Sequence, residues 1–139
     1  MKAHLTHVDG EMFRLEAEES PAIILHAPRK GERRAGPSPM QAALLAAMGC
    51  TAADVVSILS KQHISFTSFE ISAEAERATT EPKVLTRVHL HFTIRGEHVK
   101  ERDVQRAIDL STEKYCSVGI MMRRGGVQWK NTLEILPPK

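Results

Sequence analysis

The feature that most constrains this chain is one apolar segment, PMQAALLAAMGCTAADVVSIL, which runs from Pro39 to Leu59. Ser38 is a good N-cap, Pro39 suits the first helical position, and Gln41 completes an S-x-x-Q capping box. The segment therefore predicts one long helix that ends near Gln62. Because this helix is apolar on both sides, we expect both sides to be covered by other elements.

The two sides of the predicted helix differ in side-chain size. At about 100° per residue, small or polar side chains share the side of Cys50, and large apolar side chains lie opposite. The small side comprises Ala43, Ala46, Ala47, Asp54, Ser57 and Lys61, and the large side comprises Leu44, Leu45, Met48, Val55, Val56 and Leu59. We expect the large side to pack on a sheet. The small side should let the region around Cys116 approach closely, and Gly49 fits such close packing.

The rest of the chain predicts strands and two shorter helices. Runs that are apolar or that alternate in polarity predict strands at residues 3–8, 11–18, 21–27, 66–78, 84–95 and 127–136. Residues 28–38 are rich in Pro, Gly and charge and predict an exposed loop. A second helix should begin near Lys100, and a short third helix should have Ser117 as its cap and Gly125 as its stop. This order, with antiparallel hairpins, indicates an α+β fold in a single domain, residues 1–139.

Composition excludes several classes of partner. The chain is 42% hydrophobic and 26% charged, which is ordinary for a soluble globular protein. A net charge of +2 is too small to indicate nucleic-acid binding. No apolar run approaches the roughly 20 residues needed to span a bilayer without interruption by polar groups, and the N-terminus lacks the apolar stretch of a signal peptide. We therefore expect a cytoplasmic protein, with reduced thiols and with no membrane or nucleic-acid partner.

The chain has two cysteines, Cys50 and Cys116. A free cysteine often packs as a small buried hydrophobe, and that interpretation applies to both. Two features favour chemistry instead. Cys116 stands at the expected start of the third helix, where unpaired N–H groups would stabilise a thiolate, and both thiols are expected at one interface. A reactive thiol beside a resolving thiol is the arrangement of a peroxide-reducing site.

Other polar residues carry weaker signals. His89 and His91 share one face of a predicted strand, but no third ligand is evident. That face is interpreted as the solvent-facing side of a sheet, so we predict no metal and no cofactor. Asp54 and Lys61 are interpreted as ordinary polar residues at an interface or helix end. No nucleotide-binding or hydrolase motif is present.

Two segments together resemble a known family. GPSPMQAALLAAMGCTAADVVSIL, followed further along the chain by AIDLSTEKYCSVGIMM, is similar to the OsmC/Ohr-like family of osmotically inducible protein C and organic hydroperoxide resistance proteins. The similarity is greatest to the branch with the pattern SPMELLLAALGGCTA.DVVSIL…EKYCSV, and it covers nearly the whole chain. The resemblance implies an OsmC-like fold, with antiparallel sheets around a long central helix in an intertwined homodimer.

The resemblance also implies an activity. Cys50 would attack an organic hydroperoxide and become a sulfenic acid, and Cys116 would then form a disulfide with it. A dithiol reductant would restore both thiols. The protein would thus be a thiol-dependent peroxidase, an oxidoreductase of the stress response.

This chain departs from the family pattern at two charged positions. The family uses an arginine from the N-terminal region of the partner subunit and a glutamate near the start of the central helix. Met40 and Gln41 occupy the glutamate positions here. No motif assigns the arginine. Arg14 is the first choice, ahead of three arginines in the loop, which are Arg29, Arg33 and Arg34.

Two other functions remain open. A dimeric binding protein for a small molecule or acyl chain would use the thiols as packing residues, with Met48, Met121 and Met122 in an apolar pocket. A redox sensor would switch a partner through a Cys50–Cys116 disulfide. The cysteine pair favours the peroxidase, and the missing glutamate counts against it.

Overall fold

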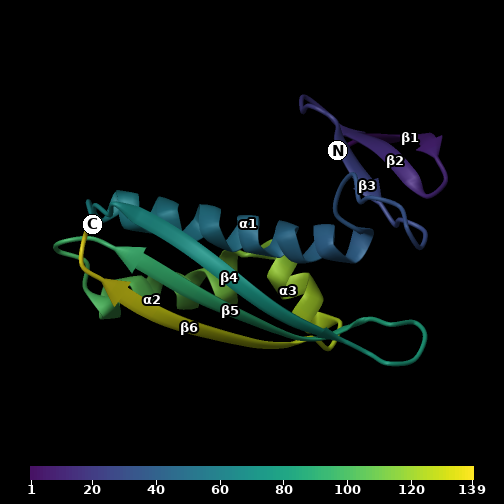
Figure 1. The fold of residues 1–139 in the computed structure, drawn as a ribbon. Coiled ribbons are helices and arrows are strands. Elements are labelled where there is room, and N and C mark those ends of the chain that lie inside the picture. Colours follow the sequence, from purple (N-terminus) through teal and green to yellow (C-terminus); the bar gives the residue numbers. More distant parts are fainter. The chain divides into compact units, whose positions relative to one another are not determined.

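The computed structural model describes residues 1–139, and these divide into two compact units, residues 1–45 and 46–139. In chain order the elements are β1 (Ala3–Asp9), β2 (Met12–Ala17), β3 (Ile23–His26), α1 (Pro39–Lys61), β4 (Ser68–Arg77), β5 (Leu85–Arg95), α2 (Glu101–Leu110), the π-helical turn η1 (Ser111–Tyr115), α3 (Ser117–Arg124) and β6 (Gln128–Leu136) (Figure 1). This mixture of small sheets and helices confirms the predicted α+β class. That residues 1–139 form a single domain stays a prediction.

The first unit is a three-stranded antiparallel sheet in the order β1-β2-β3. Arg14 in the middle strand pairs with Thr6 on one side and with Ile24 on the other. The buried side chain of His26, at the end of β3, fixes the loop that follows. Its Nδ1 accepts a hydrogen bond of 3.0 Å from the Ala35 N–H. The three predicted strands and the loop over residues 28–38 are therefore confirmed.

The start of α1 has the predicted capping box. The Gln41 N–H donates to Ser38 Oγ at 3.2 Å, and the Ser38 N–H donates to Gln41 Oε1 at 2.9 Å. These two bonds satisfy backbone groups that a helix start would otherwise leave unpaired. Pro39, which has no N–H to satisfy, is the first residue of the helix.

The second unit is built on a sheet in the order β4-β5-β6. Strands β4 and β5 form the predicted antiparallel hairpin, with Phe69 opposite Ile94. Strand β6 instead pairs with β5 in parallel, with Trp129 opposite Val88, so the sheet is mixed and the expectation of antiparallel pairing throughout is wrong here. The reason is the connection. The chain passes through α2, η1 and α3 before β6 begins, which is the long crossover that a parallel pair needs.

The core of the second unit lies between this sheet and the helices on one face of it (Figure 1). Strand β5 alternates as predicted, because four apolar residues, Val88, Leu90, Phe92 and Ile94, are fully buried and the residues between them are partly accessible. The helices contribute Val55, Leu59, Val104, Ala107 and Ile108 to the same core. Burial of each large apolar side chain stabilises the fold by about 1.5–3 kcal/mol.

Helix α1 buries a narrower stripe than the sequence predicted. Its buried residues are Ala47, Thr51, Val55 and Leu59, which recur once per turn and cross from the small side to the large side. Leu45, on the predicted large side, is 53% exposed. The expectation that the whole large side packs on the sheet is therefore wrong. A Cβ at Gly49 would meet nothing within 4 Å, so no close contact within the chain explains that glycine.

By length and composition, α1 qualifies as a membrane-spanning helix, with a mean hydropathy of 1.9 over 18 residues. The sequence expectation concerned an apolar run without polar interruption, and Asp54 does interrupt this helix. The core helix of a soluble protein meets the same two criteria, so a single such helix is weak support for a membrane segment.

The two shorter helices are present, with one difference at their junction. Helix α2 continues into η1, and the Cys116 N–H donates a hydrogen bond of 2.7 Å to the Ser111 carbonyl, five residues back. Helix α3 then begins at Ser117. Its N-cap is Cys116 and not Ser117, because the Cys116 sulfur accepts the Gly119 N–H. Gly125 follows the last residue of α3 as predicted.

Candidate active site

Three side chains with reactive atoms meet in the second unit. Cys50 and Asp54 lie one turn apart on α1, because a spacing of four residues places side chains on the same side of a helix. Cys116 comes from the N-cap of α3. The two sulfur atoms and a carboxylate oxygen of Asp54 all lie within 4.8 Å of one another. The structure thus brings together the two cysteines that the sequence places at one interface.

Cys116 is held firmly by its neighbours. Its side chain is 1% exposed, whereas Cys50 is half-buried. The Cys116 sulfur accepts a hydrogen bond of 3.3 Å from the Thr51 hydroxyl and one of 3.4 Å from the Gly119 N–H. A Cβ at Gly119 would lie only 3.1 Å from that sulfur, so a residue without a side chain suits this position. Both cysteines are free thiols.

Burial raises the pKa of the Cys116 thiol above its ordinary value, because a thiolate loses solvation in the core. The hydrogen bonds from Thr51 and Gly119 lower this pKa, but they do not offset the burial. The neighbouring Cys50 raises it further. The expectation that the helix start would stabilise a Cys116 thiolate is therefore wrong in its net effect, and Cys116 is held as a neutral thiol.

Asp54 is fixed by a residue from the π-helical turn. The Ser111 hydroxyl, which is fully buried, donates a hydrogen bond of 2.8 Å to Asp54 Oδ2. Ser111 also accepts the Cys116 N–H, so one residue positions both the carboxylate and the start of α3. Turns of this π-helical type are rare and are frequent at functional sites. Asp54 is thus a member of the thiol cluster, and not only the ordinary polar residue that the sequence suggested.

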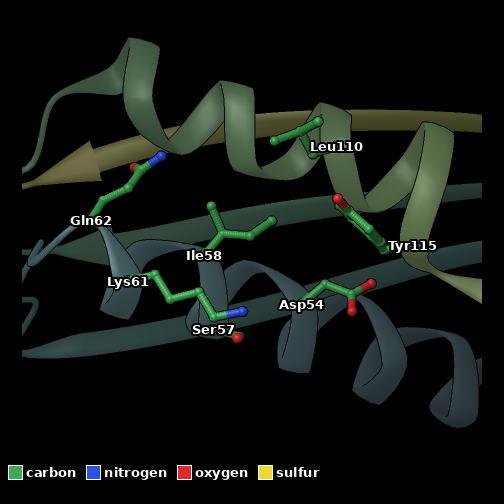
Figure 2. Close-up of a pocket in the computed structure, with 7 residues that line it drawn as sticks. All are labelled: Asp54, Ser57, Ile58, Lys61, Gln62, Leu110 and Tyr115. Carbon is green, nitrogen blue, oxygen red and sulfur yellow. The ribbon is translucent and has the colours of Figure 1, made fainter.

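A pocket of about 360 Å³ opens beside Asp54, between α1 and the segment formed by α2 and η1. Figure 2 shows the side chains that line it, which are Asp54, Ser57, Ile58, Lys61, Gln62, Leu110 and Tyr115. Its walls are apolar at Ile58, Leu110 and Tyr115, and they are charged at Asp54 and Lys61. A small molecule in this pocket would therefore touch the carboxylate that neighbours both thiols.

The sequence profile of the OsmC-like protein family matches residues 30–131, which is more than half of the chain. The chain belongs to the OsmC-like protein family. Protein YhfA of Escherichia coli strain K12 is 39% identical to this OsmC-like protein over 124 residues, which make up 89% of this chain and 90% of YhfA. The family resemblance found in the sequence is therefore confirmed.

Solved structures share the fold of this OsmC-like protein. A hypothetical protein from Aquifex aeolicus VF5 has a TM-score of 0.86 at 24% identity, over 99% of this chain and 97% of its own. An organic hydroperoxide resistance protein OsmC from Legionella pneumophila has a TM-score of 0.70 at 20% identity, over 96% of this chain and 95% of its own. Likeness at these identities establishes the OsmC-like fold.

The residues considered for the two charged positions of the family pattern lie in the first unit of this OsmC-like protein. Arg14 is half-exposed in β2 and forms an ion pair with Glu16. Its assignment to the thiols stays a prediction. Arg34 donates a hydrogen bond of 2.8 Å to Gln41 Oε1, at a position where the family has its glutamate. This chain therefore has an arginine contact at the start of α1, made to a neutral amide.

Several residues around the cluster are not predicted by the sequence. Thr51 follows Cys50 directly, but the helical wheel turns it away from the cysteine side. No sequence signal reveals the π-helical turn that brings Ser111 to Asp54. The histidine pair considered as a weak metal signal, His89 and His91, is instead occupied by hydrogen bonds of 2.8 and 2.7 Å to the Thr132 hydroxyl.

Proposed function

We propose that this OsmC-like protein is a thiol-dependent peroxidase that reduces organic hydroperoxides, with Cys50 as the nucleophile and Cys116 as the resolving thiol. The observation that carries the proposal is the approach of the two sulfur atoms to within 4.8 Å, with Cys50 accessible and Cys116 buried. An oxidant from solvent therefore meets Cys50 first. The name of the Legionella protein, which shares the fold, supports an organic hydroperoxide as the oxidant.

The chemistry needs two steps at the thiols. The Cys50 thiolate attacks the distal oxygen of the hydroperoxide, the O–O bond breaks, and the alcohol leaves with a proton. Cys50 is now a sulfenic acid, oxidised by two electrons. The Cys116 sulfur then attacks the Cys50 sulfur, the disulfide forms, and the hydroxyl leaves as water with the Cys116 proton. A dithiol returns both cysteines to thiols.

Asp54 and the pocket provide the surroundings of this reaction. Asp54 lies within 4.8 Å of both sulfurs, and its carboxylate would take a thiol proton through one bridging water and pass it on. The organic part of the substrate would lie against the apolar wall of Ile58, Leu110 and Tyr115. An arginine from the N-terminal region of a partner subunit would supply the positive charge, and Arg14 is the first choice from the sequence.

We also propose that the working form is a cytoplasmic homodimer. One chain leaves large apolar side chains exposed, including Leu45 at 53% and Met121 at 66%. A second copy would cover them, because exposed apolar surface is characteristic of protein interfaces. The open space at Gly49 is then where the partner would approach.

Binding without turnover is the second candidate, and the pocket beside Asp54 is the observation that favours it. A ligand with an apolar body would fit the wall formed by Ile58, Leu110 and Tyr115. The methionines expected at such a site, Met48, Met121 and Met122, do not line this pocket. The peroxidase is favoured because ligand binding alone does not explain why two thiols lie so close together.

Peroxide consumption in the presence of a dithiol tests the proposal. With cumene hydroperoxide and dithiothreitol, we expect turnover by the wild type and only background loss with Cys50→Ser. Without the dithiol, Cys116→Ser should stop at a sulfenic acid that dimedone traps, because no resolving thiol remains. Ser117→Ala changes an exposed neighbour of Cys116 and is the matched control.

Three results would redirect the proposal. Equal slow peroxide loss with the wild type and Cys50→Ser would contradict the peroxidase. Formation of the Cys50–Cys116 disulfide without turnover would favour the redox sensor. Thermal stabilisation by a fatty acid, with both thiols unmodified, would favour the binding protein.

A further inference from the structure

The thiol cluster has the ligand types and the spacing of a zinc site. Zinc binds cysteine sulfur at about 2.3 Å and carboxylate oxygen at about 2.0–2.2 Å, usually with four ligands. Two sulfurs on one zinc are therefore at most about 4.6 Å apart. The ligand atoms of Cys50, Cys116 and Asp54 already lie within 4.8 Å of one another. We propose that these three side chains bind one Zn²⁺ ion, with the fourth position open to the pocket.

The groups around the three ligands are those that a metal site requires. Ser111 holds Asp54 Oδ2 by a hydrogen bond of 2.8 Å, which orients the carboxylate and leaves Oδ1 for the ion. The Thr51 hydroxyl and the Gly119 N–H both donate to the Cys116 sulfur. Donors of this kind stabilise a metal-bound thiolate and fix its direction.

The charge balance at the cluster favours a cation. Two thiolates and a carboxylate would carry three negative charges, and every hydrogen bond donated to Cys116 and Asp54 comes from a neutral group. A divalent ion would replace the two thiol protons, because zinc binds thiolates and releases their protons.

The cluster is also open to an ion from solvent. Cys50 and Asp54 are half-buried, and Asp54 lines the pocket of about 360 Å³ (Figure 2). A pocket of this volume holds the water that would complete a four-ligand site. Cys116, at 1% exposed, would close the site on its inner side.

Metal binding and thiol oxidation use the same two sulfurs, so each excludes the other. This consequence rests on the proposed function. A hydroperoxide that oxidises zinc-bound Cys50 and Cys116 to the disulfide takes up two protons, yields an alcohol and water, and leaves Zn²⁺ without its sulfur ligands. Zinc would therefore protect the reduced thiols, and their oxidation would release it.

Titration of the reduced, metal-free protein with Zn²⁺, in competition with a chromophoric chelator, tests the site. We expect one tightly bound ion per chain and the loss of this binding in Cys50→Ser. Asp54→Asn, which keeps the size of the side chain, should weaken binding at least about 10-fold, and Ser111→Ala should weaken it about 10- to 100-fold. The matched control is Asp109→Asn, an exposed aspartate on α2 that should bind zinc as the wild type does.

Substitution with Co²⁺ gives a second measurement. Two thiolate ligands should produce an intense sulfur-to-cobalt absorption that falls by about half in Cys50→Ser, provided that the variant is folded by circular dichroism. Unchanged zinc affinity in Cys50→Ser or Asp54→Asn would overturn the site, and so would the absence of stoichiometric binding by the wild type. Neither measurement needs peroxide turnover. A protein that binds zinc in this way but reduces no hydroperoxide when metal-free would contradict the peroxidase and leave the metal site standing.

Discussion

The Thr51 hydroxyl donates a hydrogen bond of 3.3 Å to the Cys116 sulfur, across 65 residues of sequence. The bond is buried and joins α1 to the start of α3, where the Gly119 N–H reaches the same sulfur. Both donors favour the thiolate, and burial opposes it. The protonation of Cys116 therefore depends on a balance that one side chain can shift.

Thr51→Val should shift this balance toward the neutral thiol. Valine has the shape of threonine but cannot donate to the sulfur, so the pKa of Cys116 should rise further. The lost hydrogen bond should lower the free energy of unfolding by about 1 kcal/mol. Alkylation of Cys116 at pH 9, followed by mass spectrometry, should be slower than in the wild type. Thr51→Ser keeps the hydroxyl and is the control. Equal alkylation rates in both variants would show that the bond is unimportant.

Cys50 should react with iodoacetamide before Cys116 at pH 7. Cys50 is half-buried, whereas Cys116 is 1% exposed and has a raised pKa. Because the thiolate is the reactive form, both differences slow the reaction of Cys116. Peptide mapping after short reaction times gives the order. If Cys116 were alkylated first, Cys116 would be the more reactive thiol, and this result would contradict the assignment of Cys50 as the nucleophile.

Stability should fall in alkaline solution because of Cys116. Its pKa in the folded chain lies above the ordinary thiol value of 9.0, so the unfolded chain ionises first as pH rises. Cys116 contributes no pH dependence below that value. Above it the free energy of unfolding falls by at most about 1.4 kcal/mol per pH unit, until the folded-state pKa is reached. Urea unfolding at pH 8 and pH 10 measures the loss, and Cys116→Ser should show a smaller one. An equal loss in that variant would assign the effect to other groups.

The Gly49→Ala substitution should have different effects on a monomeric and on a dimeric protein. A Cβ at Gly49 meets nothing within 4 Å in one chain, so alanine should stabilise an isolated helix by about 1 kcal/mol. If a second copy packs against α1 there, the added methyl group should instead weaken association. Sedimentation of the wild type and the variant over a range of concentrations distinguishes the two. A monomeric wild type would end the dimer proposal.

Much of this fold follows from local patterns in the sequence. The capping box of Ser38 and Gln41 predicts the start of α1, and the alternation of Val88, Leu90 and Phe92 predicts which face of β5 is buried. These features depend on neighbouring residues, so the sequence carries them directly. The pairing of Cys50 with Cys116 was predicted from helix faces and from family resemblance together, and the structure brings the sulfurs to within 4.8 Å.

The features that the sequence did not predict depend on contacts between distant parts of the chain. The parallel pairing of β6 with β5 follows from the path of α2, η1 and α3, which periodicity does not encode. The Ser111–Asp54 bond depends on a π-helical turn, which differs from an α-helix by one residue in its hydrogen bonding. The net effect on the pKa of Cys116 depends on burial, and burial is known only once the elements are packed.

The nearness of the two sulfurs has one more consequence. A covalent link between Cys50 and Cys116 would close a loop of roughly 66 residues that contains β4, β5 and α2. In the chain-entropy account, such a link lowers the conformational entropy of the unfolded chain, which stabilises the folded state by about 4 kcal/mol. The oxidised protein should therefore resist heat and denaturant better than the reduced one. The redox state of the surroundings would then determine the resistance of the protein to unfolding, as well as the reactivity of its thiols.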